Sequence, residues 1–341
     1  MKNQNVIKFL HRFRQPLVLA ALGLFFIVTL PGLFFTRANL ISILYQVSLY
    51  GIMICGAMFP VLVGGIDRTI SGVAAMGGAI CVTIIVNNGY TTPSVFAGVL
   101  AALGVGLSSG LIHGVIVANL EIPAFLLTLA TSQVIYGIVQ TITGNQLIVI
   151  MRPEAFTNIG TMRVFGAPLP VYVLLACFCA TLFLLNNTTY GRRIYIVGGN
   201  REASKLSGIH VKRTIVIAYM VSGLMASIAG IVLSSMNQQA SSYAAQGYEN
   251  DVLAAIVVGG VSLRGGMGTL PGAIFGTLLI GIMNNGLRLL GVNSIYHNFI
   301  KGIIIIVAVA FDMFSSYKMS GLKREGFLSR FFKKIEARKA A

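Results

Sequence analysis

The residues Gly-Ile-Ile-Ile-Ile-Val-Ala-Val-Ala at positions 302–310 form a continuous apolar run without a single polar side chain. A strand of a transmembrane barrel would carry a polar residue at every second position, so this run predicts a helix. Similar runs recur along the chain, in which 56% of the 341 residues are hydrophobic and 10% are charged. An ordinary soluble domain has about 25% charged residues. The sequence therefore predicts an all-α polytopic membrane protein.

The apolar runs predict about ten transmembrane helices, because each crossing of the ~30 Å hydrocarbon layer needs about 20 residues. These helices are expected near 16–36, 40–63, 70–87, 93–119, 123–143, 168–186, 214–234, 248–263, 269–290 and 298–316. The longest polar stretches between them, 144–167 and 187–213, are too short to fold alone. We therefore expect a single transmembrane domain over 16–316.

The basic residues predict the orientation of the chain. With the N-terminus placed in the cytoplasm, the inner segments hold 20 Lys and Arg residues and the outer segments hold three. This bias predicts that both the N and C termini are cytoplasmic. It also accounts for the net charge of +16 without nucleic acid as a partner. Residues 1–15 and the basic tail 317–341 have the amphipathic pattern of interfacial helices, so we expect both to bind anionic membrane lipid.

Sequence patterns of catalysis and metal binding are missing. The chain has no G-x-x-x-x-G-K-[ST] phosphate loop and no H-E-x-x-H motif, and its four cysteines lack the spacing of zinc ligands. We expect no catalytic residue, no metal site and no cofactor in this chain.

A charged motif separates two of the apolar runs. Residues 64–72 read Gly-Gly-Ile-Asp-Arg-Thr-Ile-Ser-Gly, with Asp67, Arg68 and Ser71 as the polar members that we assign to a pathway or gate. The glycines permit a broken or re-entrant helix, whose freed backbone groups and acid would bind a polar solute. The alternative is an interfacial turn with both charges in cytoplasmic water.

A second irregular segment, residues 259–268, has five glycines and cannot form a regular helix. It carries Arg264 at an inner end of the predicted topology. We expect Asp67 to pair with Arg68 or Arg264 at the inner mouth and to form part of a gate, although both charges are compatible with a hydrated surface.

The inner loop 191–213 predicts a short helix from Arg201 to Ser207. Asn200 is suited to its N-cap, Glu202 to its first turn, and Gly208 to the left-handed residue that ends it. Such a cationic cytoplasmic loop either docks a partner or serves as a solvated connector.

Polar residues within the apolar runs are the remaining candidate solute contacts, because they are costly in a membrane. They are Gln46, Thr128, Ser132, Gln133, Asn284 and Asn285. Hydroxyls and amides suit a neutral polyol, but for each residue taken alone a hydrogen bond between helices is the favoured interpretation. Gly106, Gly110 and Gly114, like Gly272 and Gly276, have the G-x-x-x-G spacing that lets helices approach closely.

Three of these motifs carry a resemblance to a known family. Residues 64–72 resemble the Gly-Gly-Ile-Asp-Leu-Ser motif of the ribose-type sugar permeases of bacterial ABC importers. Residues 199–209 are similar to their ATPase-coupling loop, and residues 254–277 to their eighth and ninth spans. One departure is Arg68, which places a positive charge beside the acid of the motif and makes an unmodified ribose specificity doubtful.

The resemblance implies a non-enzymatic permease subunit in the bacterial cytoplasmic (inner) membrane, translocating a monosaccharide or a similar small polar solute. Its implied partners are a second permease subunit, a cytoplasmic ABC ATPase that binds ATP and Mg²⁺, and an extracytoplasmic solute-binding protein. Carried over by position, the ATPase-coupling element comprises Asn200, Glu202, Ala203, Leu206 and Gly208.

A secondary transporter driven by ions or protons is the competing class, with Asp67, Glu249 or Asp312 as its relay. Glu249 precedes the eighth predicted span on the outer side, and Asp312 is near the inner end of the tenth. Coupling sites of secondary transporters usually lie near the midplane, so these positions argue against that class.

Overall fold

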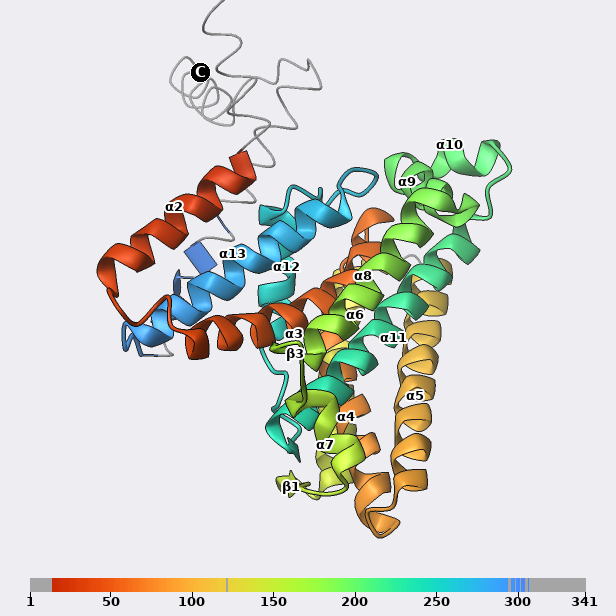
Figure 1. Ribbon diagram of the computed structural model, residues 1–341. Coiled ribbons are helices and arrows are strands. Elements are labelled where there is room, and N and C mark those ends of the chain that lie inside the picture. The colour runs from red at the N-terminus through yellow and green to blue at the C-terminus, as the bar shows by residue number, and fades with distance from the viewer. Residues whose placement is uncertain are drawn as a thin grey trace, which may run out of the picture.

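The computed structural model describes residues 14–120 and 122–293, together with 296–297, 299–300, 302–303 and 306. Among these residues, seven helices are long and apolar enough to cross a membrane (Figure 1). They are α3 (Arg37–Leu62), α4 (Ile70–Asn87), α5 (Thr92–Asn119), α6 (Ala124–Thr143), α8 (Leu169–Asn187), α11 (Val211–Asn237) and α13 (Leu270–Leu289). The prediction of a polytopic helical membrane protein is confirmed.

Two predicted spans differ from the structure in length. α2 (Arg14–Thr29) ends before the expected limit at residue 36, and α12 (Tyr248–Val258) has 11 residues, fewer than the ~20 of a full crossing. α12 ends early because Gly260, Gly265, Gly266 and Gly268 all have positive φ angles, which end a helix. The expected eighth span over 248–263 is therefore wrong. The predicted tenth span (298–316), interfacial helix (1–15) and tail (317–341) lie largely outside the described residues.

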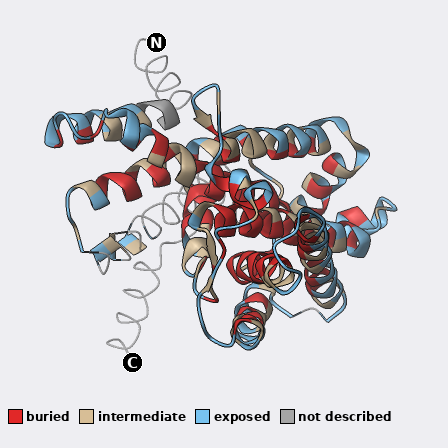
Figure 2. Ribbon diagram, turned by 60° about the horizontal axis from the view of Figure 1, so that its bottom comes forward, coloured by how far each residue is buried: buried red, intermediate tan, exposed pale blue. Residues whose placement is uncertain are grey.

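α11 lies at the centre of the bundle, where it packs against α3, α4 and α5. Figure 2 shows buried residues concentrated in the middle of the molecule and exposed ones around it. In their most apolar windows, α3 and α11 are 72% and 67% buried, whereas α6 and α8 are each 22% buried. The peripheral helices expose large apolar side chains such as Phe96, Val134 and Phe183, as expected of a surface that faces lipid.

The glycine steps are close helix contacts, as their spacing predicts. A Cβ atom on Gly110 would collide with the Tyr219 carbonyl of α11, and one on Gly114 would lie 2.7 Å from the Val216 Cα. Gly276 of α13 is packed in the same way against the Ala255 carbonyl of α12. Within this chain these glycines join helices of one bundle.

The two ends of the molecule carry different short elements (Figure 1). At one end, α9 (Thr189–Gly199) and α10 (Arg201–Leu206) connect α8 to α11. The opposite end holds α7 (Glu154–Thr161), and the described residues also form two antiparallel strand pairs. These are β1 (Ile148–Val149) with β4 (Gln239–Ala240), and β2 (Arg163–Val164) with β3 (Ala167–Pro168).

Candidate functional site

The chain between α3 and α4 is a break inside the bundle. Gly64 has a left-handed backbone (φ 77°), and residues 65–68 then run without helical structure to the start of α4. At that start, Ser71 accepts a hydrogen bond from Tyr136 of α6 at 3.1 Å. At a rise of 1.5 Å per residue, Tyr136 lies roughly 18 Å along α6 from its first residue, Ala124. The start of α4 therefore contacts α6 well inside the bundle and not at its end. The broken helix, rather than the interfacial turn, is therefore the interpretation that the structure supports.

Asp67 holds the break in shape through hydrogen bonds. Its Oδ1 accepts from the Thr69 backbone N–H at 2.9 Å and from the Thr69 hydroxyl at 2.6 Å. Its Oδ2 accepts from the Ser222 hydroxyl of α11 at 2.6 Å. A carboxylate is a strong acceptor for such donors, so Asp67 fixes the non-helical segment to the central helix.

One hydroxyl group of α6 reaches the backbone that the break frees. The buried Thr128 donates to the Ile66 carbonyl at 3.0 Å. Ser132 is also buried, and its hydroxyl donates to the Leu129 carbonyl of the same helix. The backbone carbonyl of Ser132 faces Gly72. Sequence reasoning found Thr128 and Ser132 but missed Tyr136, which follows Ser132 by one helical turn on the same face.

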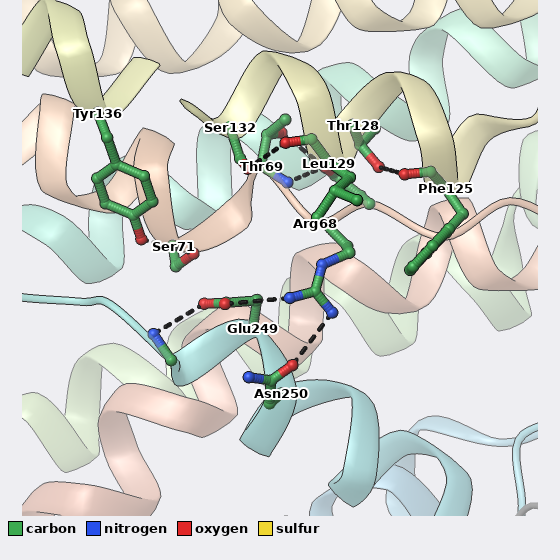
Figure 3. Close-up of polar contacts among 12 residues, drawn as sticks. Arg68, Thr69, Ser71, Phe125, Thr128, Leu129, Ser132, Tyr136, Glu249 and Asn250 are labelled. Atoms are coloured by element: carbon green, nitrogen blue, oxygen red, sulfur yellow. Dashed lines mark hydrogen bonds and ion pairs between the residues drawn. The ribbon is translucent and has the colours of Figure 1, made fainter. Parts of the chain in front are cut away.

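Arg68 forms an ion pair with Glu249 at the start of α12. The distance from Nη2 to Glu249 Oε1 is 3.2 Å, and Nη1 donates to Asn250 Oδ1 at 3.1 Å. The guanidinium also lies over the ring of Phe125, 5.8 Å from its centre. Figure 3 shows the Arg68 side chain reaching from the break toward both α12 residues. The side chains of Arg68 and Glu249 are only 18% and 14% exposed.

This pairing corrects two expectations. Arg68 is paired with Glu249 rather than with Asp67, and Glu249 lies beside the break rather than at the outer surface. The half-length of α12 is the cause: an 11-residue helix spans roughly 16 Å, about half of the hydrocarbon layer. The signal was present in the sequence, because the glycines of 259–268 bound this short apolar run on one side.

The end of α3, just before the break, is the base of the break. There the inner loop 191–213 and the glycine-rich segment 259–268 meet the chain that leads into residues 64–72. The Gly266 N–H donates to the Leu62 carbonyl at 2.8 Å, and the Arg201 guanidinium donates to the Val63 carbonyl at 3.2 Å. The Tyr195 hydroxyl donates to the Gly268 carbonyl at 3.1 Å. Burial raises the pKa of the Tyr195 phenol, so this donor stays protonated. The inner loop is thus tied both to the end of α3 and to the glycine-rich segment.

The short helix predicted in the inner loop is present as α10. The Asn200 side chain caps it by accepting from the Ala203 N–H at 3.0 Å, and Gly208 ends it with φ 76°. Glu202 pairs with Lys205 at 2.7 Å on the exposed side. Leu206 is 91% exposed, an unusual environment for an apolar side chain.

Most of the other predicted polar residues lie away from the break, whereas the backbone carbonyl of Arg264 lies against Gly64. Asn284 donates to Asp251 at 3.2 Å and Asn285 donates to Asn39 at 2.8 Å, so both form hydrogen bonds between elements of the bundle. Gln133 is exposed on α6, and Arg264 is exposed on the glycine-rich loop. Gln46 lies on α3 beside a separate cavity.

A bundle of long apolar helices with a polar break and a half-length helix is the architecture of a multi-pass membrane protein. Residues 39–309 match the family described as branched-chain amino acid transport system / permease component. The chain belongs to this family, whose members are proteins of the inner membrane.

Individual relatives extend over most of the chain. The ribose import permease protein RbsC of Escherichia coli (strain K12) is 38% identical over 302 residues, which cover 87% of this chain and 93% of the relative. RbsC of Bacillus subtilis (strain 168) is 36% identical over 85% of this chain and 91% of its own. The L-arabinose transport system permease protein AraH of Escherichia coli (strain K12) is 34% identical, with coverages of 82% and 84%. No solved structure matches the chain. The resemblance to ribose-type sugar permeases is confirmed.

Proposed function

We propose that this chain is the membrane-spanning permease subunit of an ATP-driven importer for a monosaccharide or a similar small polar solute. The observation that carries the proposal is the match, over nearly full length, to relatives named as ribose and L-arabinose permeases. The polar break agrees with this function, because irregular backbone within a bundle is suited to a solute pathway.

The proposed partners are a second permease subunit, a cytoplasmic ATPase with its ATP and Mg²⁺, and an extracytoplasmic binding protein. The capped helix α10 supports an ATPase contact, because Glu202 and Leu206 are exposed and the loop is bonded to the base of the break. At the opposite end, Phe165 is 99% exposed in the turn between β2 and β3. This exposed ring is the contact that we assign to the binding protein.

One observation favours the second class, an ion-coupled transporter. Glu249 lies inside the bundle beside Arg68, where a proton or ion relay would be expected to lie. That class needs no ATPase, so a single preparation separates the two functions.

The test is affinity capture of the tagged chain in mild detergent. The wild type is expected to recover an ATPase, and the Glu202→Arg variant to lose it. Glu154→Arg is the matched control, because Glu154 is also an exposed acid in the first turn of a helix but lies at the opposite end. Uptake by the purified chain alone in liposomes, without ATPase recovery, would replace the proposal by the ion-coupled function.

A further inference from the structure

The cavity beside Gln46 lies away from the break, between α3, the end of α7, the end of α11, the start of α12 and α13. Its volume is about 350 Å³, within the range of roughly 300–1,000 Å³ that small-molecule sites occupy. Asn237, the last residue of α11, places it in the half of the molecule opposite α10. A solute arriving at that end would meet this cavity before the inner loop.

The lining of the cavity is rich in hydroxyl and amide groups. The polar residues that line it include Ser42, Tyr45, Gln46, Asn237, Tyr248 and Arg288. No acidic side chain is among the described residues of the lining. Such a surface offers hydrogen-bond donors and acceptors without a countercharge for a cation, which matches a polyhydroxylated solute.

The side-chain amide of Gln46 lacks hydrogen-bond partners that a bound solute could provide. Both atoms of its amide are buried, and neither has a hydrogen-bond partner within the described part of the chain. Buried amides without partners are rare because their desolvation is not compensated. A hydroxyl group supplies a donor and an acceptor at once, so a rotation of the Gln46 side chain toward a sugar in this cavity would give both halves of the amide a partner.

The aromatic wall of the cavity is ordered. The rings of Tyr50 and Tyr248 pack edge to face with their centres 5.1 Å apart. Arg288 lines the same space, and no carboxylate lies within 4.0 Å of its charged group among the described residues. Its donors remain available to a ligand that carries oxygen atoms.

We propose that this cavity binds one monosaccharide-sized polyhydroxylated solute before it reaches the break, with the Gln46 amide as a specificity-determining contact. This inference rests on the proposed function as a sugar permease. It assigns the first solute contact to the α3–α11–α13 face rather than to the charged residues of the break.

The test is protection of a cysteine from alkylation in the purified chain, reconstituted in vesicles. Ser42→Cys is introduced together with Cys179→Ser, because Cys55, Cys81 and Cys177 are buried and Cys179 is exposed. A small membrane-impermeant maleimide is applied with increasing concentrations of individual pentoses and hexoses, or of glycerol. One of the sugars is expected to slow the reaction in a saturable manner, whereas glycerol does not.

Adding Gln46→Leu is expected to raise the half-protecting sugar concentration about tenfold, the effect of losing one buried hydrogen-bonding group. Asn237→Cys, an exposed residue of the same lining, is a second reporter if Ser42→Cys does not fold. Phe165→Cys is the control outside the cavity, which should be alkylated at a rate that no sugar changes.

Equal protection by glycerol, no protection by any sugar at either reporter, or an unchanged half-protecting concentration in Gln46→Leu would overturn the inference. ATP-dependent sugar uptake by the assembled transporter in cells is measured in parallel. Uptake without protection rejects the cavity and leaves the proposed function in place. Protection without ATP-dependent uptake supports the cavity and rejects the ATP-driven function.

Discussion

At the residue scale, Arg68 and Glu249 each keep a charge inside the bundle because the other lies 3.2 Å away. Asn250 and the ring of Phe125 complete the surroundings of the guanidinium, and the Gly247 N–H donates to the second carboxylate oxygen at 3.0 Å. The two side chains are only 18% and 14% exposed, so solvent offers little compensation when one partner is removed. A pair of this kind is costly to break on one side, whereas removing both charges costs much less.

Arg68→Leu is therefore expected to destabilise the chain by about 3 kcal/mol, because Glu249 is left charged and without a cation. The double variant Arg68→Leu with Glu249→Leu should recover most of this loss. Thermal stability in detergent, followed by fluorescence-detected size-exclusion chromatography of a tagged chain, measures both effects. A double variant that is less stable than either single one would contradict the pairing.

Tyr195 and Tyr190 provide a comparison between two hydrogen bonds from one helix. Tyr195 donates to Gly268 of the glycine-rich loop, and Tyr190 donates to the Thr214 carbonyl of α11. Tyr195→Phe and Tyr190→Phe should each cost about 1 kcal/mol of stability. Only Tyr195→Phe is expected to lower transport while ATPase capture is kept, since of these two bonds that of Tyr195 is the one that joins the inner loop to the glycine-rich segment. Equal transport by the two variants would remove the special role of Tyr195.

At the element scale, the helix limits show where sequence patterns predict structure and where they fail. The run 70–87 matches α4 at both ends, because a glycine-rich segment and the Asn87-Asn88-Gly89 turn bound it. The run 248–263 was too long, because apolar residues such as Val261 and Leu263 continue after the helix has ended. A high hydropathy favours burial but does not specify a helix, and these residues are largely buried in a loop.

The site was predictable only in its local parts. The cap at Asn200 and the stop at Gly208 depend on neighbouring residues, so the sequence alone was sufficient for both. The Arg68–Glu249 pair joins residues that are 181 positions apart, and no local pattern specifies that contact. Thr128 was found for its polarity, but its role as a partner of the Ile66 carbonyl followed only from the packing of α6 on the break.

The contact between α5 and α11 depends on glycine at defined positions. Gly110→Ala would bring a methyl group to 2.7 Å from the Met220 Cα and against the Tyr219 carbonyl, so the two helices must separate. Overpacking of this kind is expected to cost about 1–3 kcal/mol. Gly104→Ala on the same helix is the matched control, because nothing lies within 4 Å of its added methyl group. It should stabilise by up to about 1 kcal/mol. Equal melting temperatures for both variants would contradict the close contact.

At the scale of the whole molecule, hydrogen bonds connect the end that carries α10 to the break. Arg201 is bonded to Val63 at the end of α3, and Gly266 to Leu62 one residue earlier. A displacement of α10 by a partner therefore acts on the two glycine-rich segments together. The β2–β3 turn precedes α8 and α10 follows it, so the turn and α10 are separate surfaces at the two ends of that helix.

An exposed apolar residue at each end can be replaced by aspartate, and the two variants are expected to impair different steps. Leu206→Asp on α10 is expected to reduce ATPase capture about tenfold, because it puts a charge where an apolar contact is proposed. Phe165→Asp at the other end should leave ATPase capture unchanged, but it should weaken stimulation of the assembled transporter by its binding protein. Each variant is the control for the other, since both replace an exposed apolar side chain, 91% and 99% accessible, by the same acid. Capture assays in detergent and binding-protein-stimulated ATP hydrolysis in vesicles read the two effects separately. Loss of ATPase capture in both variants would mean that the ends do not act as independent docking surfaces.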